Sequence, residues 1–368
     1  FISIPFPMQR FGKVGLAFGF SAKVIHDLLG VNFDQSYYFD INHLVVTNLE
    51  IDRQIYDLYH EIGIGFKNPF PRLTIEPFGH RFIPAMYGCK CYYSKDGEPW
   101  GEGNPLSEEE IYSLKPWTFE RLEKSEPVQK VLSQYNFLIQ HYSFPEKRLF
   151  GEFNPHYRVW SSLQNLGSVI NNAFSIQGNE FLMNYLMNPN LVNLLYKNIL
   201  QLMLLCLEFF PRIDSSPLKN VFIGNCTVAM ISPQQYRDIN YQYDLKIMEF
   251  ARLKGANFLM HQDSGVTPHL ENYASFKYLH ALDFGQDTDF KKLVKLFPSV
   301  SLNCILFPSW IYEASCEEIS DQLLQIMTLA KDLPSLSFTL YEIDTLLTKE
   351  KIFMFYEIFK KCVERILY

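Results

Sequence analysis

The sequence lacks the short motifs that mark several large enzyme classes. It contains no G-x-G-x-x-G and no G-x-x-x-x-G-K-[ST], and the glycine-containing stretch Gly15-Leu16-Ala17-Phe18-Gly19 has no strand pattern before it. We therefore expect no dinucleotide or nucleoside triphosphate site of those types. A G-x-S-x-G elbow is missing as well, which argues against a serine hydrolase.

Positive charge and long apolar runs are also scarce. Lysine and arginine number 33 against 40 acidic residues, so the net charge is -7, and the longest basic cluster is Lys291-Lys292 with Lys295. A surface that follows nucleic-acid phosphates needs more positive charge, so we expect no nucleic-acid partner. The most apolar run, Leu202 to Leu207, is far shorter than the roughly 20 residues that span a bilayer. We interpret it as part of a core helix and expect no membrane partner.

The cysteines do not form the pattern of a disulfide framework. They number seven, and the opening residues Phe1 to Pro5 lack the basic and apolar regions of a secretory signal. We expect free thiols and a cytoplasmic location. Cys89 and Cys91 form a C-x-C pair without a second pair at the spacing of a zinc ribbon, which argues against that kind of metal site.

Apolar and aromatic residues, in contrast, are abundant. They make up 48% and 16% of the 368 residues. A sequence this apolar can bury enough surface to offset the entropy lost on folding, so we expect an ordered, compact protein. The length allows two small domains or one large barrel with insertions.

The second half of the chain alternates short strand patterns with longer helical ones. Ser232, Pro233 and Gln235 form a helix start, and Ser315 with Glu318 forms a second capping box. Because strands joined by helices return to the same end of a sheet, we predict parallel pairing. The predicted strands are Asn220–Gly224, Asn257–Met260, His280–Phe284, Ser301–Phe307 and Ser337–Tyr341, and the predicted helices begin near Ser232, Pro268, Asp289, Ser315 and Thr348.

The first half is less regular, and three further strands there bring the predicted count to eight. We predict an α/β fold, a (β/α)8 TIM-type barrel with an elaborated N-terminal half, and keep a doubly wound open sheet as the alternative. No linker is visible, so we predict a single domain over 1–368, insertion-rich over 1–150 and regular over 220–368. The three strands are Ser36–Phe39, Arg72–Ile75 and Arg148–Phe153; between them we predict a hairpin over Ile83–Pro99 and helices near Glu108, Pro127 and Asn190.

Polar residues stand where most predicted strands end, which is where a parallel barrel carries its chemistry. His261 and Asp263 are two residues apart, so both side chains can project to one side and share a metal or a substrate. The alternative is that His261 is a buried barrel histidine and Asp263 caps the next helix. Other polar residues at or just past strand ends are Asp40, Glu76, Glu152, Asn154, Asn225, Asp283, Gln286 and Glu342.

Two of the remaining polar residues are candidates for substrate binding. Asn225 follows Gly224, and a glycine at a strand end lets a ligand approach the backbone closely, although a simple turn has the same pattern. Arg158 can pair with a substrate carboxylate through two hydrogen bonds, although a loop arginine is also common as a surface group.

At these residues the sequence resembles the uroporphyrinogen decarboxylase superfamily, which includes corrinoid-dependent methyltransferases that act on thiols. The resemblance covers about Asn220 to Trp310 and, more weakly, Phe150 to Val192. Its pieces are Gly224-Asn225-Cys226, Ile231-Ser232-Pro233 with Tyr236, His261-x-Asp263-x-Gly265 with Thr267-Pro268, Leu282-Asp283, and Gln177-Gly178 with Asn188-Pro189-x-Leu191-Val192. The resemblance implies a (β/α)8 barrel.

The methyltransferase branch implies a zinc-type site, with departures from its H-x-C and later cysteine ligands. Asp263 stands in place of the first cysteine, and the last predicted strand ends in Glu342 without a cysteine. Carboxylates also bind zinc and harder metals, so we predict a divalent metal, most simply zinc, on His261, Asp263 and Glu342. Cys304 lies within the neighbouring strand and could reach the metal, but its place inside the strand rather than at its end favours packing in the core.

The resemblance implies methyl transfer between a corrinoid or similar carrier and a small thiol or other nucleophile. In this hypothesis His261, Asp263 and Asp283 are catalytic, and Arg10, Glu152, Asn154, Arg158 and Asn225 bind the substrate. Candidate partners are a small-molecule substrate, a corrinoid protein and a second copy of the chain.

Two alternatives stay open. One is a metal-free decarboxylase of a tetrapyrrole or another polycarboxylate, with Arg10, Lys13 and Arg158 as carboxylate clamps. The N-terminal stretch Met8 to Lys13 has one arginine and one lysine, where the decarboxylases carry an arginine-rich segment. The other alternative is a binding protein that kept the barrel without the chemistry.

Overall fold

The computed structural model describes residues 3–6, 8–69, 77–141, 166–213 and 217–367. By its internal contacts the chain forms two compact units. The first, here called the sheet unit, comprises Phe1–Val31, Ile51–Pro69 and Met260–Tyr368; the second, the helical unit, comprises Asn32–Glu50 and Phe70–Leu259. The prediction of a single domain over 1–368 stays a prediction.

The sheet unit is built on a mostly parallel sheet. Its strands follow the hydrogen-bonded order β1-β3-β10-β9-β8-β7, and β2 pairs with β3. Strands β3, β10, β9 and β8 pair in parallel, whereas β1 and β2 are antiparallel to β3. The bounds are β1 Ser3–Pro5, β2 Gln9–Phe11, β3 Val14–Ser21, β7 Asn257–His261, β8 Leu279–Gly285, β9 Ser301–Leu306 and β10 Leu336–Ile343. The chain passes from the helical unit into the sheet unit within β7.

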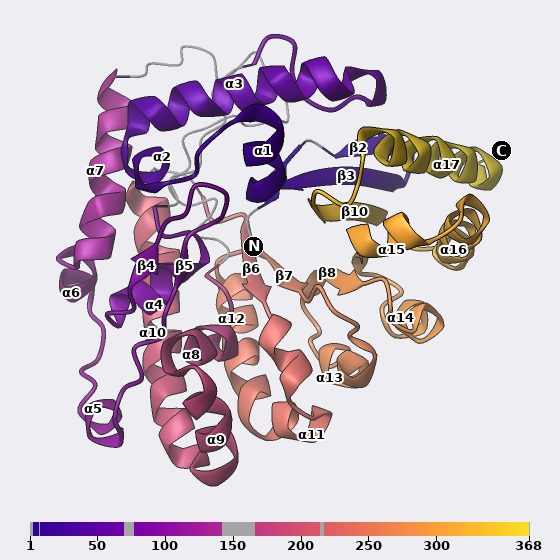
Figure 1. Cartoon of the computed structure of the whole chain (residues 1–368). Coiled ribbons are helices and arrows are strands. Elements are labelled where there is room, and N and C mark those ends of the chain that lie inside the picture. The colour runs from indigo at the N-terminus through magenta and orange to yellow at the C-terminus, as the bar shows by residue number, and fades with distance from the viewer. Residues whose placement is uncertain (1–2, 7, 70–76, 142–165, 214–216, 368) are drawn as a thin grey trace. The chain divides into compact units, whose positions relative to one another are not determined.

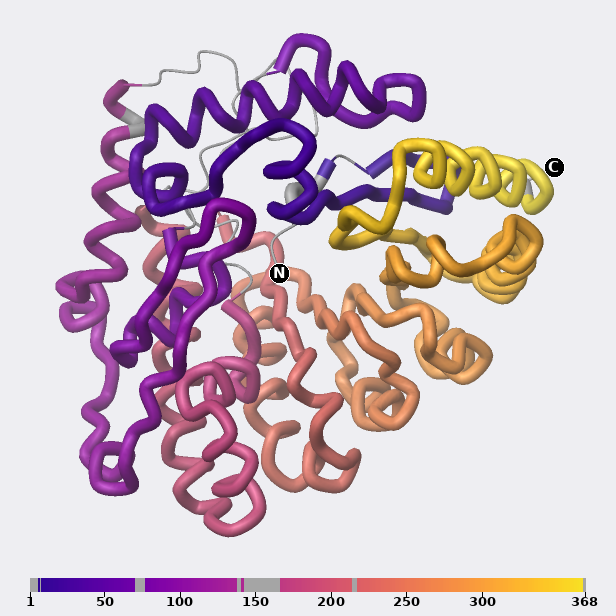
Figure 2. Tube along the Cα trace, in the orientation of Figure 1, coloured from indigo at the N-terminus to yellow at the C-terminus, as the bar shows by residue number. Residues whose placement is uncertain are grey.

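Strands β3 and β10 join distant parts of the sequence. Figure 2 shows the indigo N-terminal segment beside the yellow C-terminal one, and the register pairs Val14 with Leu336 and Phe18 with Leu340. In β3 almost every residue is buried, on both faces of the strand. Burial on both faces is typical of a parallel strand covered by helices on one side and packed core on the other.

Helices follow the strands of the sheet unit and cover them. Helix α17 lies beside β2 and β3 (Figure 1), and its Phe359 packs edge-on against Phe338 of β10 and Phe11 of β2. Helix α16 packs against α17, and α15 packs against β10. The helices of this unit are α1 Ala22–Leu29, η1 His60–Ile62, η5 Thr267–His269, α13 Leu270–Tyr273, α14 Phe290–Leu296, α15 Pro308–Glu313, α16 Cys316–Leu329 and α17 Lys349–Leu367; α3 Ile41–Tyr59 belongs to both units.

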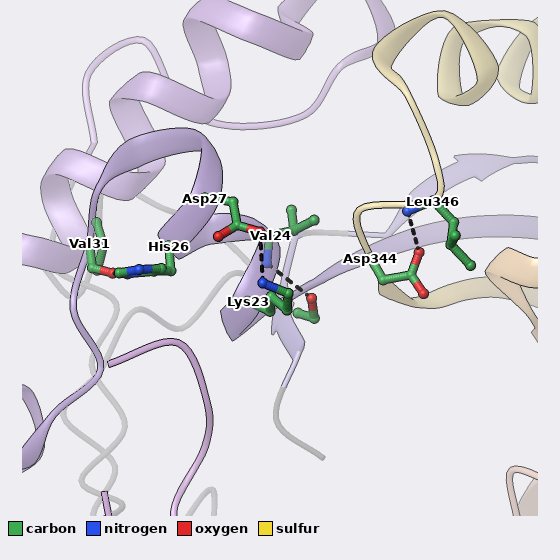
Figure 3. A network of polar contacts seen from close by, with 8 residues as sticks. Lys23, Val24, His26, Asp27, Val31, Asp344 and Leu346 are labelled. Carbon is green, nitrogen blue, oxygen red and sulfur yellow. Dashed lines mark hydrogen bonds and ion pairs between the residues drawn. The ribbon is translucent and has the colours of Figure 1, made fainter. Parts of the chain in front are cut away.

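Helix α1 begins directly where β3 ends, and polar contacts fix both of its ends (Figure 3). The Ser21 hydroxyl accepts a hydrogen bond from the backbone N–H of Val24, and Lys23 pairs with Asp27 at 3.0 Å. At the other end, His26 Nδ1 lies 2.7 Å from the carbonyl oxygen of Val31. These local contacts stabilise a strand followed directly by a helix, which the sequence analysis did not predict.

The helical unit packs around α10. This helix spans Pro189–Ile213 and buries thirteen of its residues against other helices, among them α8, α9 and α12. It is the one helix of the described residues long and apolar enough to cross a membrane, but 56% of its apolar window is buried inside the protein. That burial agrees with the prediction of a core helix at Leu202–Leu207. The other elements are α2 Gln35–Phe39, η2 Gly79–Arg81, α4 Phe82–Met86, β4 Cys91–Tyr92, β5 Trp100–Gly101, α5 Glu108–Tyr112, α6 Phe119–Glu123, α7 Glu126–His141, α8 Val169–Gln177, α9 Asn179–Met187, β6 Asn220–Gly224, η3 Cys226–Met230, α11 Pro233–Gln235, the π-helix η4 Tyr236–Asn240 and α12 Tyr241–Leu253.

The five strands predicted in the second half are confirmed as β6 to β10, and both predicted capping boxes are present at Ser232 and Ser315. The predicted strand Ser36–Phe39 is wrong, because these residues lie in helix α2. The Asp34 carboxylate accepts a hydrogen bond from the Ser36 backbone N–H and caps that helix. A strand of the first half lies instead at Val14–Ser21.

The other predictions for the first half have mixed outcomes. The hairpin predicted over Ile83–Pro99 is reduced to the two-residue strands β4 and β5, and Ile83 lies in helix α4. The helices predicted near Glu108, Pro127 and Asn190 are present as α5, α7 and α10. Predicted strands Arg72–Ile75 and Arg148–Phe153 lie outside the described residues. The chain is thus a mixed α/β protein with a mostly parallel sheet, compatible with a TIM-type fold.

Candidate functional site

A hydrogen-bonded pair of His261 and Asp283 lies on the face of the sheet in the sheet unit. His261 is the last residue of β7, and its Nδ1 lies 2.9 Å from Oδ2 of Asp283, near the end of β8. The two side chains are 16% and 21% exposed. Both are therefore shielded from most of the solvent yet can be reached from it.

The pair continues into a chain of hydrogen bonds across the next two strands. Asn303 of β9 donates its Nδ2–H to Asp283 Oδ1 at 3.2 Å. The hydroxyls of Ser337 and Thr339, both in β10, donate to Asn303 Oδ1 at 3.0 Å each. A carboxylate only accepts hydrogen bonds, and the two hydroxyls donate here, so the amide of Asn303 has a single satisfactory orientation.

This chain of hydrogen bonds sets the tautomer of His261. Because Asp283 only accepts, Nδ1 of His261 carries the hydrogen that it shares, and Nε2 of the neutral ring keeps its lone pair. Histidines that bind metals commonly donate their second ring N–H to a carboxylate in this way. The arrangement therefore prepares Nε2 of His261 to bind a metal or to accept a proton.

Asp263 lies close to His261 in the loop after β7. A ring nitrogen of His261 and a carboxylate oxygen of Asp263 are within 4.8 Å of each other. The intervening Gln262 is fully buried and accepts a hydrogen bond from Tyr273 at 2.7 Å. The structure thus brings His261 and Asp263 together as the spacing predicted, and these imidazole and carboxylate donors fit zinc or a harder divalent metal.

Two glycines hold this loop against the loop after β8. A Cβ atom on Gly285 would lie 2.6 Å from the backbone oxygen of Asp263, and one on Gly265 would lie 2.7 Å from Oδ2 of Asp287. The Val266 backbone N–H also donates to the Thr288 hydroxyl at 3.1 Å. The close approach fixes the backbone that carries Asp263 and leaves no room for a side chain at Gly285, where a Cβ would meet backbone atoms.

The end of β10 also lies close to His261, although β10 is not a neighbour of β7 in the sheet. The rings of Tyr341 and His261 have centroids 6.5 Å apart, although β8 and β9 separate their strands. In a flat sheet strands three places apart lie about 14 Å apart, so the contact indicates strong curvature. The next residue, Glu342, has φ 54°, and the ladder shifts register between Leu340 and Ile343. Bulges and strained residues of this kind often re-aim side chains next to functional sites.

Among the predicted substrate residues, Arg10 lies in the sheet unit but away from His261. Arg10 of β2 donates to the Ser335 hydroxyl at 3.3 Å, just before β10 begins. Tyr341 lies at the opposite end of the same strand, about 20 Å along an extended chain. Asp40 caps the start of α3, because its carboxylate accepts from the Asn42 backbone N–H at 2.9 Å. Residues Glu76, Glu152, Asn154 and Arg158 lie outside the described residues.

Two other predicted residues have clear surroundings. Cys304 is fully buried in β9, and burial raises the pKa of its thiol above the ordinary value, as its predicted core position requires. Asn225 belongs to the helical unit, directly after β6, and is fully buried.

The sequence analysis missed the residues that support Asp283. Asn303, Ser337 and Thr339 are polar side chains inside strands rather than at their ends. A signal was present, since Ser337 and Thr339 alternate with apolar Phe338 and Leu340. Such alternation puts polar groups on one face of a strand, but only the register shows that Ser337 lies opposite Asn303.

Comparison with known proteins shows a likeness to solved structures. No family model matches the sequence, and no curated protein is similar to it. A solved structure of a "methyltransferase from Methanosarcina mazei" is similar over 95% of this chain and 100% of that chain, with a TM-score of 0.56 and 11% sequence identity. At this identity the likeness shows that the two proteins share a fold.

Proposed function

We propose that this chain transfers a methyl group from a corrinoid or similar carrier to a small nucleophile, such as a thiol, at a divalent metal near His261. The observation that carries the proposal is the His261–Asp283 hydrogen bond at the end of β7. The structural likeness to a methyltransferase supports it. Under this proposal the chain is an enzyme of the uroporphyrinogen decarboxylase-like superfamily.

His261 and Asp263 would hold the metal. His261 would bind through Nε2, because its Nδ1 is taken by Asp283, and Asp263 would bind through a carboxylate oxygen. When bound, a divalent metal lowers the pKa of a ligated thiol or water and so supplies a nucleophile at neutral pH. Glu342 is the proposed third ligand, because it follows the β10 segment whose Tyr341 faces His261.

Asp283 would act through His261. Its carboxylate fixes the direction of the imidazole ring, makes the ring a stronger electron donor and compensates the positive charge at the site. Asn303 in turn keeps Asp283 from rotating, since it donates a hydrogen bond to the second carboxylate oxygen. The protein thus supplies a rigid nitrogen ligand, and the partial exposure of His261 leaves room for the acceptor of the methyl group.

Metal binding and methyl transfer test the proposal together. Zinc affinity is measured by competition with a chromophoric chelator, and activity by the decay of methylcobalamin absorbance in the presence of small thiols. We expect one zinc per chain, and His261→Ala should lose zinc and activity. His60→Ala is the matched control, because His60 is exposed on η1 and stacks on Tyr56.

Two outcomes would contradict the proposal. Metal-free protein that binds porphyrinogens would favour the decarboxylase alternative with its carboxylate clamps. Unchanged ligand binding and cellular activity after substitution of His261, Asp263 and Asp283 would favour a binding protein on the same fold.

A further inference from the structure

The side-chain amide of Asn225, in the helical unit, is satisfied on one side only. Its Nδ2–H donates to Oδ2 of Asp244 at 2.8 Å, whereas its Oδ1 is buried and has no hydrogen-bond partner among the described residues. Leaving a buried acceptor unpaired costs roughly 1–3 kcal/mol. A fully buried amide with one open oxygen therefore calls for a compensating partner beyond the described residues, such as a ligand or a bound water.

Asp244 prevents the amide from turning over. Its Oδ2 accepts a second hydrogen bond, from the Tyr236 hydroxyl at 2.6 Å. An ionised carboxylate cannot donate, so Nδ2 of Asn225 must face Asp244 and Oδ1 must face away from it. The negative charge behind the amide also polarises it, which makes Oδ1 a stronger acceptor.

Asp244 is an expensive group to keep inside a protein. Burial raises its pKa to about 6, and the hydrogen bonds from Tyr236 and Asn225 counteract this only in part. Tyr236 begins the π-helix η4, an irregularity that is frequent at functional sites. An apolar residue would fill the same space without this cost, so the carboxylate is best explained by what it does to Asn225.

Asn225 also stands where a ligand is expected in a parallel α/β fold. It directly follows β6, and ligands in such folds bind beyond the carboxyl ends of the strands. Its backbone, at φ -107° and ψ 28°, lies in the bridge region, where many active-site residues are found. The following backbone is fixed as well, because the N–H of Thr227 donates to the Asn171 side chain at 3.0 Å.

We propose that Asn225 is the recognition residue of a ligand site at the end of β6, where its Oδ1, oriented by Asp244, accepts a hydrogen bond from an N–H or O–H group of a small molecule. The ligand class is a hydrogen-bond donor, such as an amide N–H. Molecules that present only an acceptor at this position are rejected, because two acceptors would face each other.

Two amide probes that differ in one hydrogen-bond donor test the proposal. N-methylacetamide has an N–H, and N,N-dimethylacetamide lacks it. Affinities are measured by NMR titration of the backbone amides of Thr227 and Val228. We expect N-methylacetamide to bind roughly 2- to 10-fold more tightly, the effect of one net hydrogen bond. Asn225→Leu should abolish this preference.

Asp244→Asn is the sharper variant. Its amide can present either an oxygen or an N–H to Asn225, so the Asn225 side chain is no longer held with Oδ1 toward the ligand. We expect the preference for N-methylacetamide to be lost. Asp238→Asn is the matched control, because Asp238 lies on η4, just before α12, and accepts a hydrogen bond from exposed Gln234.

A pH titration gives an independent check. Protonation of Asp244 below about pH 6 should have the same effect as Asp244→Asn, so the preference should fall at pH 5 in the wild type only. Among the described residues, the other titratable groups facing Asp244 are Tyr236, Tyr185 and Tyr196. They remain neutral across this range because phenols ionise near pH 10. Equal binding of the two amides, a preference that Asp244→Asn leaves intact, or an ordered water on Oδ1 that neither probe displaces would overturn the proposal.

Discussion

The two units each contain an aspartate that holds an asparagine side chain, and the two pairs differ in one respect. In the sheet unit Asp283 binds Asn303, whose oxygen is filled by the hydroxyls of Ser337 and Thr339. In the helical unit Asp244 binds Asn225, whose oxygen has no partner among the residues that the structure describes. The same pair of residue types thus ends in a closed network in one unit and in an open acceptor in the other.

The third group on each aspartate explains the different roles. Asp283 shares its second oxygen with an imidazole, which can bind a metal or a proton. Asp244 shares its oxygen with the phenol of Tyr236, which stays neutral. A closed amide therefore serves to position a neighbour, whereas an open amide is itself available for recognition.

The largest expected effect is the pH dependence that Asp244 gives to the free energy of unfolding. The folded protein binds the proton of Asp244 more tightly than the unfolded chain does, because burial raises its pKa from 3.8 to about 6. Its contribution to the free energy of unfolding is therefore greatest below pH 4 and is lost as the pH rises to 6, by about 3 kcal/mol. Chemical denaturation between pH 4 and 7 should show this fall in the wild type and not in Asp244→Asn. If the free energy of unfolding falls equally in the wild type and in Asp244→Asn over this pH range, the expectation is wrong.

A smaller effect is expected at the closed pair. Asp283→Asn should lower zinc affinity by about 10- to 100-fold, because the neutral amide orients His261 poorly and presents a donor to Asn303. Asp289→Asn makes the same charge change at the N-cap of α14, where asparagine caps equally well. If both variants bind zinc as tightly as the wild type, Asp283 does not act through His261.

The hydroxyls that close the sheet-unit network should contribute less again. Ser337→Ala and Thr339→Val each remove one donor from Asn303 Oδ1, and we expect each to lower the free energy of unfolding by about 1 kcal/mol. The double variant leaves this oxygen as open as that of Asn225 and should cost more than the sum of the two. Strict additivity in a double-mutant cycle would show that the two hydroxyls act independently of each other and contradict a shared acceptor.

The smallest effect concerns the strained end of β10. Glu342→Ala and Glu342→Gly both remove the proposed ligand, but only glycine adopts φ 54° without strain. The glycine variant should be more stable than the alanine variant by roughly 0.5–1 kcal/mol, while both lose zinc affinity equally. A glycine variant that retains zinc would exclude Glu342 as a ligand.

Local patterns predicted much of the fold and of the site. Strands β6 to β10 follow from runs and helix caps that lie next to each other in the sequence. His261, Asp263 and Asp283 follow from the rule that chemistry stands at strand ends. Both predictions need only the residues within one strand–helix unit.

What the sequence analysis missed depends on contacts between distant residues. Val14–Ser21 contains two glycines, and a Cβ on Gly15 would meet the side chains of Met8 and Ser337. Gly15 thus serves close packing in β3, although in the sequence the two glycines suggest a loop. The aromatic run Ser36–Phe39 suggests a strand, yet the carboxylate of Asp34 caps it as a helix. The role of Asn303 could not be predicted from the sequence, because it depends on the register that places Ser337 opposite it.

The pairing of β3 with β10 also has a consequence for how the protein is made. Val14 finds its partner Leu336 more than 300 residues later. At roughly 5–20 residues per second, the apolar strand β3 waits tens of seconds on the ribosome with one edge unpaired. During that time it is the segment most exposed to wrong pairing, so slower translation or a missing chaperone should harm the yield of soluble protein before it harms the finished fold.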